Sequence, residues 1–165
     1  VFGLNYGLKC IGLRYFNVYG RRQDPNGAYA AVIPKFTSQL MAHESPVING
    51  DGSYSRDFTY IENVLQMNQL ALQTDNEKAF GQVFNTAVGE RADLKTMSEL
   101  LRQYLSELDS DIANIKIVFG PDRKGDIPHS LASIDKAKTL LGYDPTHNLE
   151  SGLKEAVNWY WNNLG

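Results

Sequence analysis

The chain has 165 residues, and its 16 Lys and Arg against 19 Asp and Glu give a formal net charge of −3 at pH 7. This charge and the absence of a long Lys/Arg run argue against a nucleic-acid-binding surface, and no apolar run approaches the roughly 18 residues of a membrane span. The sequence does not open with the basic segment that begins a signal peptide. We therefore expect a cytoplasmic protein with no membrane or nucleic-acid partner, of a length that fits one domain or parts of two.

The spacing of apolar residues predicts alternating helices and strands, which favours the α/β class. The single cysteine, Cys10, lies in a predicted strand, so we expect it to be buried and structural. Ile61, Val64, Leu65, Leu70 and Leu72 are expected to face the core from the helix predicted over 61–73. In chain order, the sequence predicts a helical turn over 1–6 closed by Gly7, a strand over 9–15, a helix over 29–43, extended segments over 46–49 and 57–60, a helix over 61–73, a strand over 82–87, a helix over 96–108, a strand over 115–119, a short helix between Ser133 and Gly142, and a helix over 150–164.

The first segment with candidate ligand-binding residues is LRYFNVYG, residues 13–20. A predicted buried strand gives way here to polar and aromatic side chains, and ligands of open α/β sheets lie outside the carboxyl ends of the strands. The amide of Asn17 can both donate and accept toward a polar ligand. The residues alone leave open the alternative that Asn17 only bonds to the backbone at the end of the strand.

The second segment is INGDGSYSRDFTY, residues 48–60. Gly50 and Gly52 allow a tight turn in which the backbone can approach a ligand closely. Arg56 follows in an extended stretch, and its guanidinium matches the geometry of a phosphate that it binds through two hydrogen bonds. The alternative is a merely solvated arginine. We expect the neighbouring Asp57 to be structural.

The third segment is DRKGDIPHS, residues 122–130. Gly125 permits a bend, Arg123 offers a second cation, and the carboxylate of Asp126 offers two acceptors suited to ribose hydroxyls. Read alone, the segment is equally consistent with a charged surface loop. The three histidines of the chain do not have the spacing of metal ligands, so we predict no metal site.

Together, LRYFNVYG, the GDG that precedes RDF, and the R-x-G-D that precedes LGY-x-P resemble the nucleotide-sugar 4-epimerases of the extended short-chain dehydrogenase/reductase superfamily. The resemblance covers nearly the whole chain. It implies an α/β fold that combines the final part of a Rossmann-type doubly wound sheet with a smaller α/β C-terminal substrate-binding domain. Residues 1–165 would be the C-terminal portion of such an enzyme, with the N-terminal Rossmann half absent, because the sequence has neither the family's Gly-rich dinucleotide loop nor its Tyr-x-x-x-Lys pair. We therefore assign no catalytic residue within the chain.

The resemblance also implies roles for individual residues. Phe16, Asn17 and Val18 would lie beside the nicotinamide of NAD, and Arg56 and Arg123 would converge on one diphosphate. Residues 47–49 would pack against the uracil ring. The complete set of implied substrate-binding residues is Asn17, Ala31, Val32, Val47, Ile48, Asn49, Arg56, Arg123, Asp126 and Ser130.

The implied activity is that of an NAD-dependent isomerase, which interconverts UDP-N-acetylglucosamine and UDP-N-acetylgalactosamine through a 4-keto intermediate. UDP-glucose and UDP-galactose are further candidate substrates. The resemblance implies that Ser130 sets the substrate preference, because a small side chain at this position would leave room for an N-acetyl group that a tyrosine would displace. The residues alone leave open the alternative that Ser130 only begins the next extended segment. Alternatives are a nucleotide-sugar dehydratase, a UDP-glucuronate 4-epimerase, or a non-catalytic protein that binds sugar nucleotides. We expect a homodimer for the full-length enzyme, and we expect this chain alone to be inactive and not to retain NAD.

Overall fold

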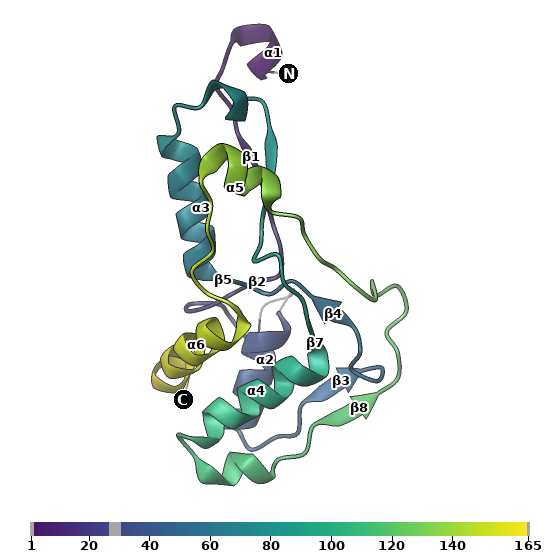
Figure 1. Ribbon diagram of the computed structural model, residues 1–165. Coiled ribbons are helices and arrows are strands. Elements are labelled where there is room, and N and C mark those ends of the chain that lie inside the picture. Colours follow the sequence, from purple (N-terminus) through teal and green to yellow (C-terminus); the bar gives the residue numbers. More distant parts are fainter. Residues whose placement is uncertain (1, 27–30, 165) are drawn as a thin grey trace.

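The computed structural model describes residues 2–26 and 31–164, in which helices alternate with short strands (Figure 1). The helices are α1 (Phe2–Tyr6), α2 (Val32–Met41), α3 (Ile61–Gln73), α4 (Leu94–Ser106), α5 (Asp135–Leu141) and α6 (Leu149–Leu164), with 3-10 turns over Glu77–Ala79 and Ser110–Asn114. The strands are β1 (Gly12–Tyr15), β2 (Val18–Tyr19), β3 (Val47–Asn49), β4 (Ser55–Arg56), β5 (Thr59–Tyr60), β6 (Val83–Thr86), β7 (Ala92–Asp93) and β8 (Val118–Gly120). The predicted α/β class is confirmed.

The strands pair two by two, and most of the pairs are parallel. β1 pairs with β6, β2 with β5, and β3 with β8 in parallel, whereas β4 pairs with β7 in antiparallel orientation. Figure 1 shows β1, α3 and α5 in one part of the molecule, and α2, α4, β3 and β8 in the other. This division matches two separate hydrophobic clusters.

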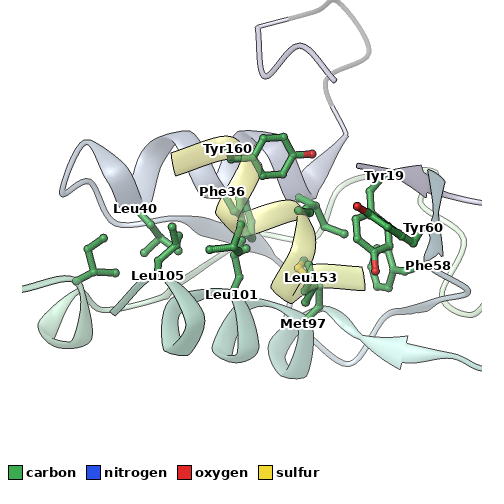
Figure 2. Packing of buried hydrophobic residues seen from close by; sticks show 14 of the residues in the cluster. Tyr19, Phe36, Leu40, Phe58, Tyr60, Met97, Leu101, Leu105, Leu153 and Tyr160 are labelled. Atoms are coloured by element: carbon green, nitrogen blue, oxygen red, sulfur yellow. The ribbon is translucent and has the colours of Figure 1, made fainter. Parts of the chain in front are cut away.

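The larger cluster lies between α2, α4 and α6 (Figure 2). Phe36 and Leu40 of α2 pack in it with Leu101 of α4 and Leu153 of α6, and each of these side chains is buried. Burying a large apolar side chain stabilises a fold by about 1.5–3 kcal/mol. The cluster therefore holds α2 in a fixed place, which matters because α2 forms one wall of the candidate site.

The smaller cluster covers the β1–β6 pair. It contains Met67 of α3, Phe84 of β6 and Ala137 of α5, all buried. The buried hydroxyl of Tyr143 donates to the Ala87 carbonyl at 2.8 Å, which satisfies the one polar atom of this ring. The cluster supports β1, whose carboxyl end leads to Asn17.

Two tyrosines connect β2 and β5 to the last helix. The ring centroids of Tyr19 and Tyr60 are 5.5 Å apart, and the Tyr19 hydroxyl donates to the Leu149 carbonyl at 3.3 Å. Gly152 of α6 lies against both rings, so closely that a methyl group on it would overlap the Tyr19 hydroxyl. The β2–β5 pair is thereby fixed to α6.

Most predicted elements exist, and α3 has the predicted bounds, but some positions were wrong. Cys10 is exposed rather than buried, because β1 begins only at Gly12 and Cys10 precedes it. Val64 is buried as expected, whereas Leu65 and Leu72 are 49% and 87% exposed, because the buried stripe of α3 runs through Val64 and Met67. The helix predicted over 29–43 runs from Val32 to Met41, and its positions 29–30 lie outside the described residues. Across residues 2–26 and 31–164, no helix combines the length and the apolar character needed to cross a membrane.

Candidate functional site

A cavity of about 250 Å³ lies where α2, β3, β4 and the loop after β8 meet. One part of its wall is apolar and the rest carries three cations and one carboxylate. Its lining residues are Asn17, Val32, Lys35, Phe36, Val47, Ile48, Asn49, Arg56, Phe58, Leu94, Arg123 and Asp126. An apolar wall with a few convergent polar groups is typical of a small-molecule site. We call it the inner cavity.

A second hollow of about 330 Å³ adjoins the first and is more open. It shares Asn17, Arg56 and Asp126 with the inner cavity and adds other residues of the loop after β8. Its lining residues are Asn17, Arg56, Gly125, Asp126, Ile127 and Ser130. We call it the outer cavity. The shared residues mark the junction through which one elongated ligand can extend from the first space into the second.

Backbone hydrogen bonds bring Arg56 and the loop after β8 together. The Ser55 N–H donates to the Pro128 carbonyl at 2.9 Å, and the Ser130 N–H donates to the Ser55 carbonyl at 3.0 Å. Arg56 Nη1 then donates to the Ser55 and Pro128 carbonyls at 2.9 and 3.2 Å. The guanidinium is therefore held in place by backbone groups, while its remaining N–H groups have no partner among the described residues.

Asp57, directly after Arg56, lies underneath this arrangement. Its side chain is fully buried and accepts the N–H groups of Val88 at 2.9 Å and Gly89 at 3.0 Å, with a longer contact of 3.4 Å from the Ala132 N–H. Burial raises the pKa of this carboxyl above its usual range, although the three N–H groups act in the opposite direction. The predicted structural role of Asp57 is confirmed, because the residue connects three chain segments and does not line either cavity.

β3 presents a free strand edge in the inner cavity. The Val118 N–H of its partner β8 donates to the Pro46 carbonyl at 2.9 Å, and the Gly50 N–H donates to the Gly120 carbonyl of β8 at 3.0 Å. Because alternate residues of a strand point their backbone groups to opposite sides, Val47 and Asn49 direct their N–H and C=O groups away from β8. Among the described residues no strand covers that side.

Gly50 ends this strand with a backbone that favours glycine. Its φ is +77°, and a side chain at this position would also overlap the carboxylate of Asp122. Both facts explain the glycine, because the turn needs the left-handed region and the loop after β8 packs directly against it. Gly50 therefore keeps the β3 end and the Arg123 loop in contact.

Asn17 connects the two structural halves at the junction of the cavities. It lies between β1 and β2 with an unusual φ of +32°, and its carbonyl accepts the Thr59 N–H at 3.2 Å. Non-glycine residues with positive φ are uncommon, and they cluster at functional sites. The backbone geometry turns the chain out of β1 and places the Asn17 side chain on the wall of both cavities.

The structure brings most of the predicted site residues together. Eight of them line the inner cavity: Asn17, Val32, Val47, Ile48, Asn49, Arg56, Arg123 and Asp126. Ser130 lines the outer cavity. Ala31 immediately precedes α2 and lines neither space. Phe16 packs against the smaller hydrophobic cluster and Val18 pairs with Thr59, so neither of them lines the two cavities.

The sequence interpretation missed several lining residues. Phe36, Phe58 and Leu94 carry the apolar wall, and Lys35 adds a third cation. Val32, Lys35 and Phe36 are spaced i, i+3 and i+4, which places them on one helix face, so this signal was present in the sequence. Phe58 and Leu94 have no such signal, since apolar residues of this kind are ordinarily part of a core. Among the described residues, no group of three His, Cys, Asp or Glu side chains is arranged to hold a metal ion.

Residues 2–87, more than half of the chain, match the NAD dependent epimerase/dehydratase family. The chain belongs to this family. Among solved structures it is similar to the UDP-glucose 4-epimerase of Thermotoga maritima with UDP-glucose, at 36% identity and a TM-score of 0.88, over 99% of this chain and 50% of that one. It is also similar to the UDP-N-acetylglucosamine 4-epimerase of Methanobrevibacter ruminantium in complex with UDP-N-acetylmuramic acid, at 38% identity and a TM-score of 0.86, over 98% and 49% of the two chains.

Another relative is named for a different sugar nucleotide. UDP-glucuronate 4-epimerase 4 of Arabidopsis thaliana is 32% identical, over 94% of this chain and 36% of that protein. The 165-residue chain spans about half the length of the curated relatives that it matches, or less. The similarity to solved epimerases confirms the Rossmann-type fold expected from the sequence.

Proposed function

We propose that this chain binds the UDP part of a nucleotide sugar and forms the C-terminal, substrate-binding portion of an NAD-dependent UDP-hexose 4-epimerase. The observation that carries the proposal is the inner cavity, where two arginines from distant segments, Arg56 and Arg123, share a wall with Asp126 and with apolar residues. An apolar wall packs against the base, a carboxylate accepts hydrogen bonds from the ribose hydroxyls, and cations bind the diphosphate. The length of the chain, about half that of its relatives, supports the assignment to a portion of a longer enzyme.

The base end of the site is formed by the free edge of β3. Uracil has one N–H donor between two carbonyl acceptors, and the free C=O and N–H groups of β3 at Val47 and Asn49 can pair with that N–H and with one of the carbonyls. Phe36 and Phe58 supply apolar surface for the ring. Recognition of uracil through a strand edge would place the ribose toward Asp126, whose two carboxylate oxygens accept from the hydroxyls.

The diphosphate would occupy the junction of the two cavities. Arg56 has unused N–H donors there, and Asn17 lies on the same wall. Arg123 completes a pair of cations around the anion. Hydrogen bonds from a charged donor contribute about 1.5–3 kcal/mol each, which is enough to dominate the binding of a nucleotide diphosphate.

The hexose would occupy the outer cavity beside Ser130. Its small side chain supports UDP-N-acetylglucosamine and UDP-N-acetylgalactosamine as substrates, with the plain hexose nucleotides as further candidates. A UDP-glucuronate 4-epimerase is the second candidate function, because a relative of that name is 32% identical over 94% of this chain. A nucleotide-sugar dehydratase and a non-catalytic sugar-nucleotide-binding protein are the remaining alternatives.

The family is NAD dependent by description, but the 165 residues do not fit a complete NAD site. They include no Gly-x-x-Gly-x-x-Gly loop to hold a pyrophosphate and no Tyr-x-x-x-Lys pair. Phe16, Asn17 and Val18 are proposed to border the nicotinamide in the longer enzyme, where the missing elements would come from outside these residues. The chain by itself is expected to bind UDP, to leave NAD unbound and to show no epimerase activity.

Isothermal titration calorimetry of the 165-residue chain tests this proposal. UDP is expected to bind, ADP to bind at least tenfold more weakly because a purine does not match the strand edge, and NAD to give no heat of binding. Equal affinity for UDP and ADP would mean that the site binds the diphosphate anion without recognising the base. Absence of UDP binding, or copurification of NAD with the chain, would refute the proposal.

A further inference from the structure

Lys35 is the third cation of the inner cavity, beside Arg56 and Arg123. It is exposed, and its ammonium has no hydrogen-bond or ion-pair partner within residues 2–26 and 31–164. It shares a face of α2 with Val32 and Phe36, which line the same cavity. Because Phe36 is buried in the core, the backbone of α2 holds Lys35 at a fixed place on the cavity wall.

The two cavities define the end at which Lys35 lies. Asn17, Arg56 and Asp126 line both spaces, whereas Lys35 and Arg123 line the inner one only. The loop that carries Arg123 continues into the outer cavity through Gly125 and Asp126, but no residue of α2 lines the outer cavity. Lys35 therefore belongs to the part of the site farther from the hexose. In the ligand orientation of the proposed function, that part holds the base.

The chemistry of uracil leaves one acceptor for such a cation. The N3–H lies between two carbonyl oxygens, and a strand edge supplies one acceptor for N3–H and one donor for one of the carbonyls. O2 lies next to the ribose, so O4 is the carbonyl directed away from Asp126. A lysine ammonium has three donors and no acceptor, and it therefore complements O4 and not the amino group that cytosine has there.

We propose that Lys35 donates a hydrogen bond to O4 of the uracil ring and thereby contributes to the selection of uridine nucleotides; the proposal rests on the proposed function. The observed juxtaposition of Lys35, Phe36 and the free edge of β3 in one cavity supports it. The competing assignment is a third phosphate-binding cation beside Arg56 and Arg123. The two assignments differ in which atom of UDP is sensitive to the lysine.

Calorimetry with UDP analogues that differ in a single atom, combined with variants of Lys35, separates the two assignments. The affinities of UDP, 4-thio-UDP and 2-thio-UDP are compared for the wild-type chain, Lys35→Met and Lys35→Arg, with Lys154→Met as a control on an exposed position of α6. Sulfur accepts hydrogen bonds weakly. The wild type is expected to bind 4-thio-UDP about fivefold more weakly than UDP, on the scale of one exposed charged hydrogen bond.

In Lys35→Met this preference for UDP over 4-thio-UDP is expected to disappear, while the effect of sulfur at O2 stays as in the wild type. Lys35→Arg should restore part of the preference, and Lys154→Met should leave it intact. If Lys35→Met keeps the fivefold preference, or weakens all three ligands equally as a phosphate contact would, the assignment to O4 is refuted. A wild-type chain that does not bind UDP would instead refute the proposed function, and this inference with it.

Discussion

The N–H of Ser130 donates to the carbonyl of Ser55 across 3.0 Å, and this bond fixes two loops of the candidate site to each other. The Ser55 N–H extends the contact by donating to Pro128 at 2.9 Å. Since Arg56 follows Ser55 directly and Asp126 lies on the bonded loop, the backbone sets the positions of a cation and a carboxylate before any ligand binds. Preorganised charges of this kind reduce the cost of ordering side chains on binding.

Replacing either arginine should weaken the binding of UDP. Arg56→Ala and Arg123→Ala each remove charge-assisted hydrogen bonds, so we expect a loss of affinity of about tenfold or more from a contribution of about 1.5–3 kcal/mol. Lys124→Ala is the matched control, because this residue is an exposed cation beside Arg123 that lines neither cavity. Unchanged calorimetric affinity in one of the arginine variants would remove that arginine from the site.

The sequence motifs predicted which residues gather in the site, but they did not predict the backbone contacts that bring these residues together. Asn17, Arg56 and Asp126 were recognisable because their chemistry suits phosphate and ribose and because they follow strands or glycine turns. Their convergence depends on hydrogen bonds such as Ser55–Ser130, which involve only backbone atoms and leave no trace in side-chain identity. Long-range pairing of this kind is a property of the fold alone.

The errors of the sequence interpretation have physical causes as well. Cys10 was expected to be buried because it lies in the strand predicted over 9–15, yet β1 starts two residues after it. Lys35 was passed over because exposed lysines are abundant on any surface. Phe58 was missed for the opposite reason, since a buried aromatic residue is ordinarily core, and here it is both core and cavity wall.

Gly152→Ala should destabilise the fold at the contact between α6 and the tyrosine pair. The new methyl group would overlap the Tyr19 hydroxyl and lie 2.8 Å from Cβ of Tyr60. Overpacking of a core typically costs about 1–3 kcal/mol, and the free energy of unfolding in urea measures it. Tyr19→Phe in the Gly152→Ala background should recover part of the loss by removing the overlapping hydroxyl. A Gly152→Ala variant as stable as the wild type would show that the helix moves to accommodate the methyl group.

Asp57 should make the stability of the chain depend on pH. Burial raises the pKa of its carboxyl above the ordinary 3.8, so the folded state binds the proton more tightly than the unfolded state does. The stabilisation from the protonated form is therefore complete below about pH 4 and is lost as the pH rises through the folded-state pKa. The slope is at most about 1.4 kcal/mol per pH unit for one proton.

Asp57→Asn supplies the reference for this measurement, because its amide has a similar shape and does not titrate. The free energy of unfolding of the wild type minus that of Asp57→Asn should fall as the pH is raised from 4 to 7. Exposed carboxylates change both proteins alike and cancel in the difference. A difference that rises with pH would mean that the N–H groups of Val88, Gly89 and Ala132 outweigh burial and lower the pKa instead.

Ser130→Tyr should change which sugar nucleotide the site accepts. Ser130 lines the outer cavity together with Ile127, whose side chain is 65% exposed, so a tyrosine would fill space that the proposed N-acetyl group needs. Calorimetry should show a loss of affinity for UDP-N-acetylglucosamine of about tenfold or more, on the scale of 1–3 kcal/mol for overpacking, with a much smaller change for UDP-glucose and none for UDP. Ser130→Ala is the control that keeps the site small while removing the hydroxyl, and it should lower the affinity for the acetylated sugar by severalfold at most, as expected for one lost neutral hydrogen bond. An equal loss for both sugar nucleotides in Ser130→Tyr would show that residue 130 does not set the size of the hexose site.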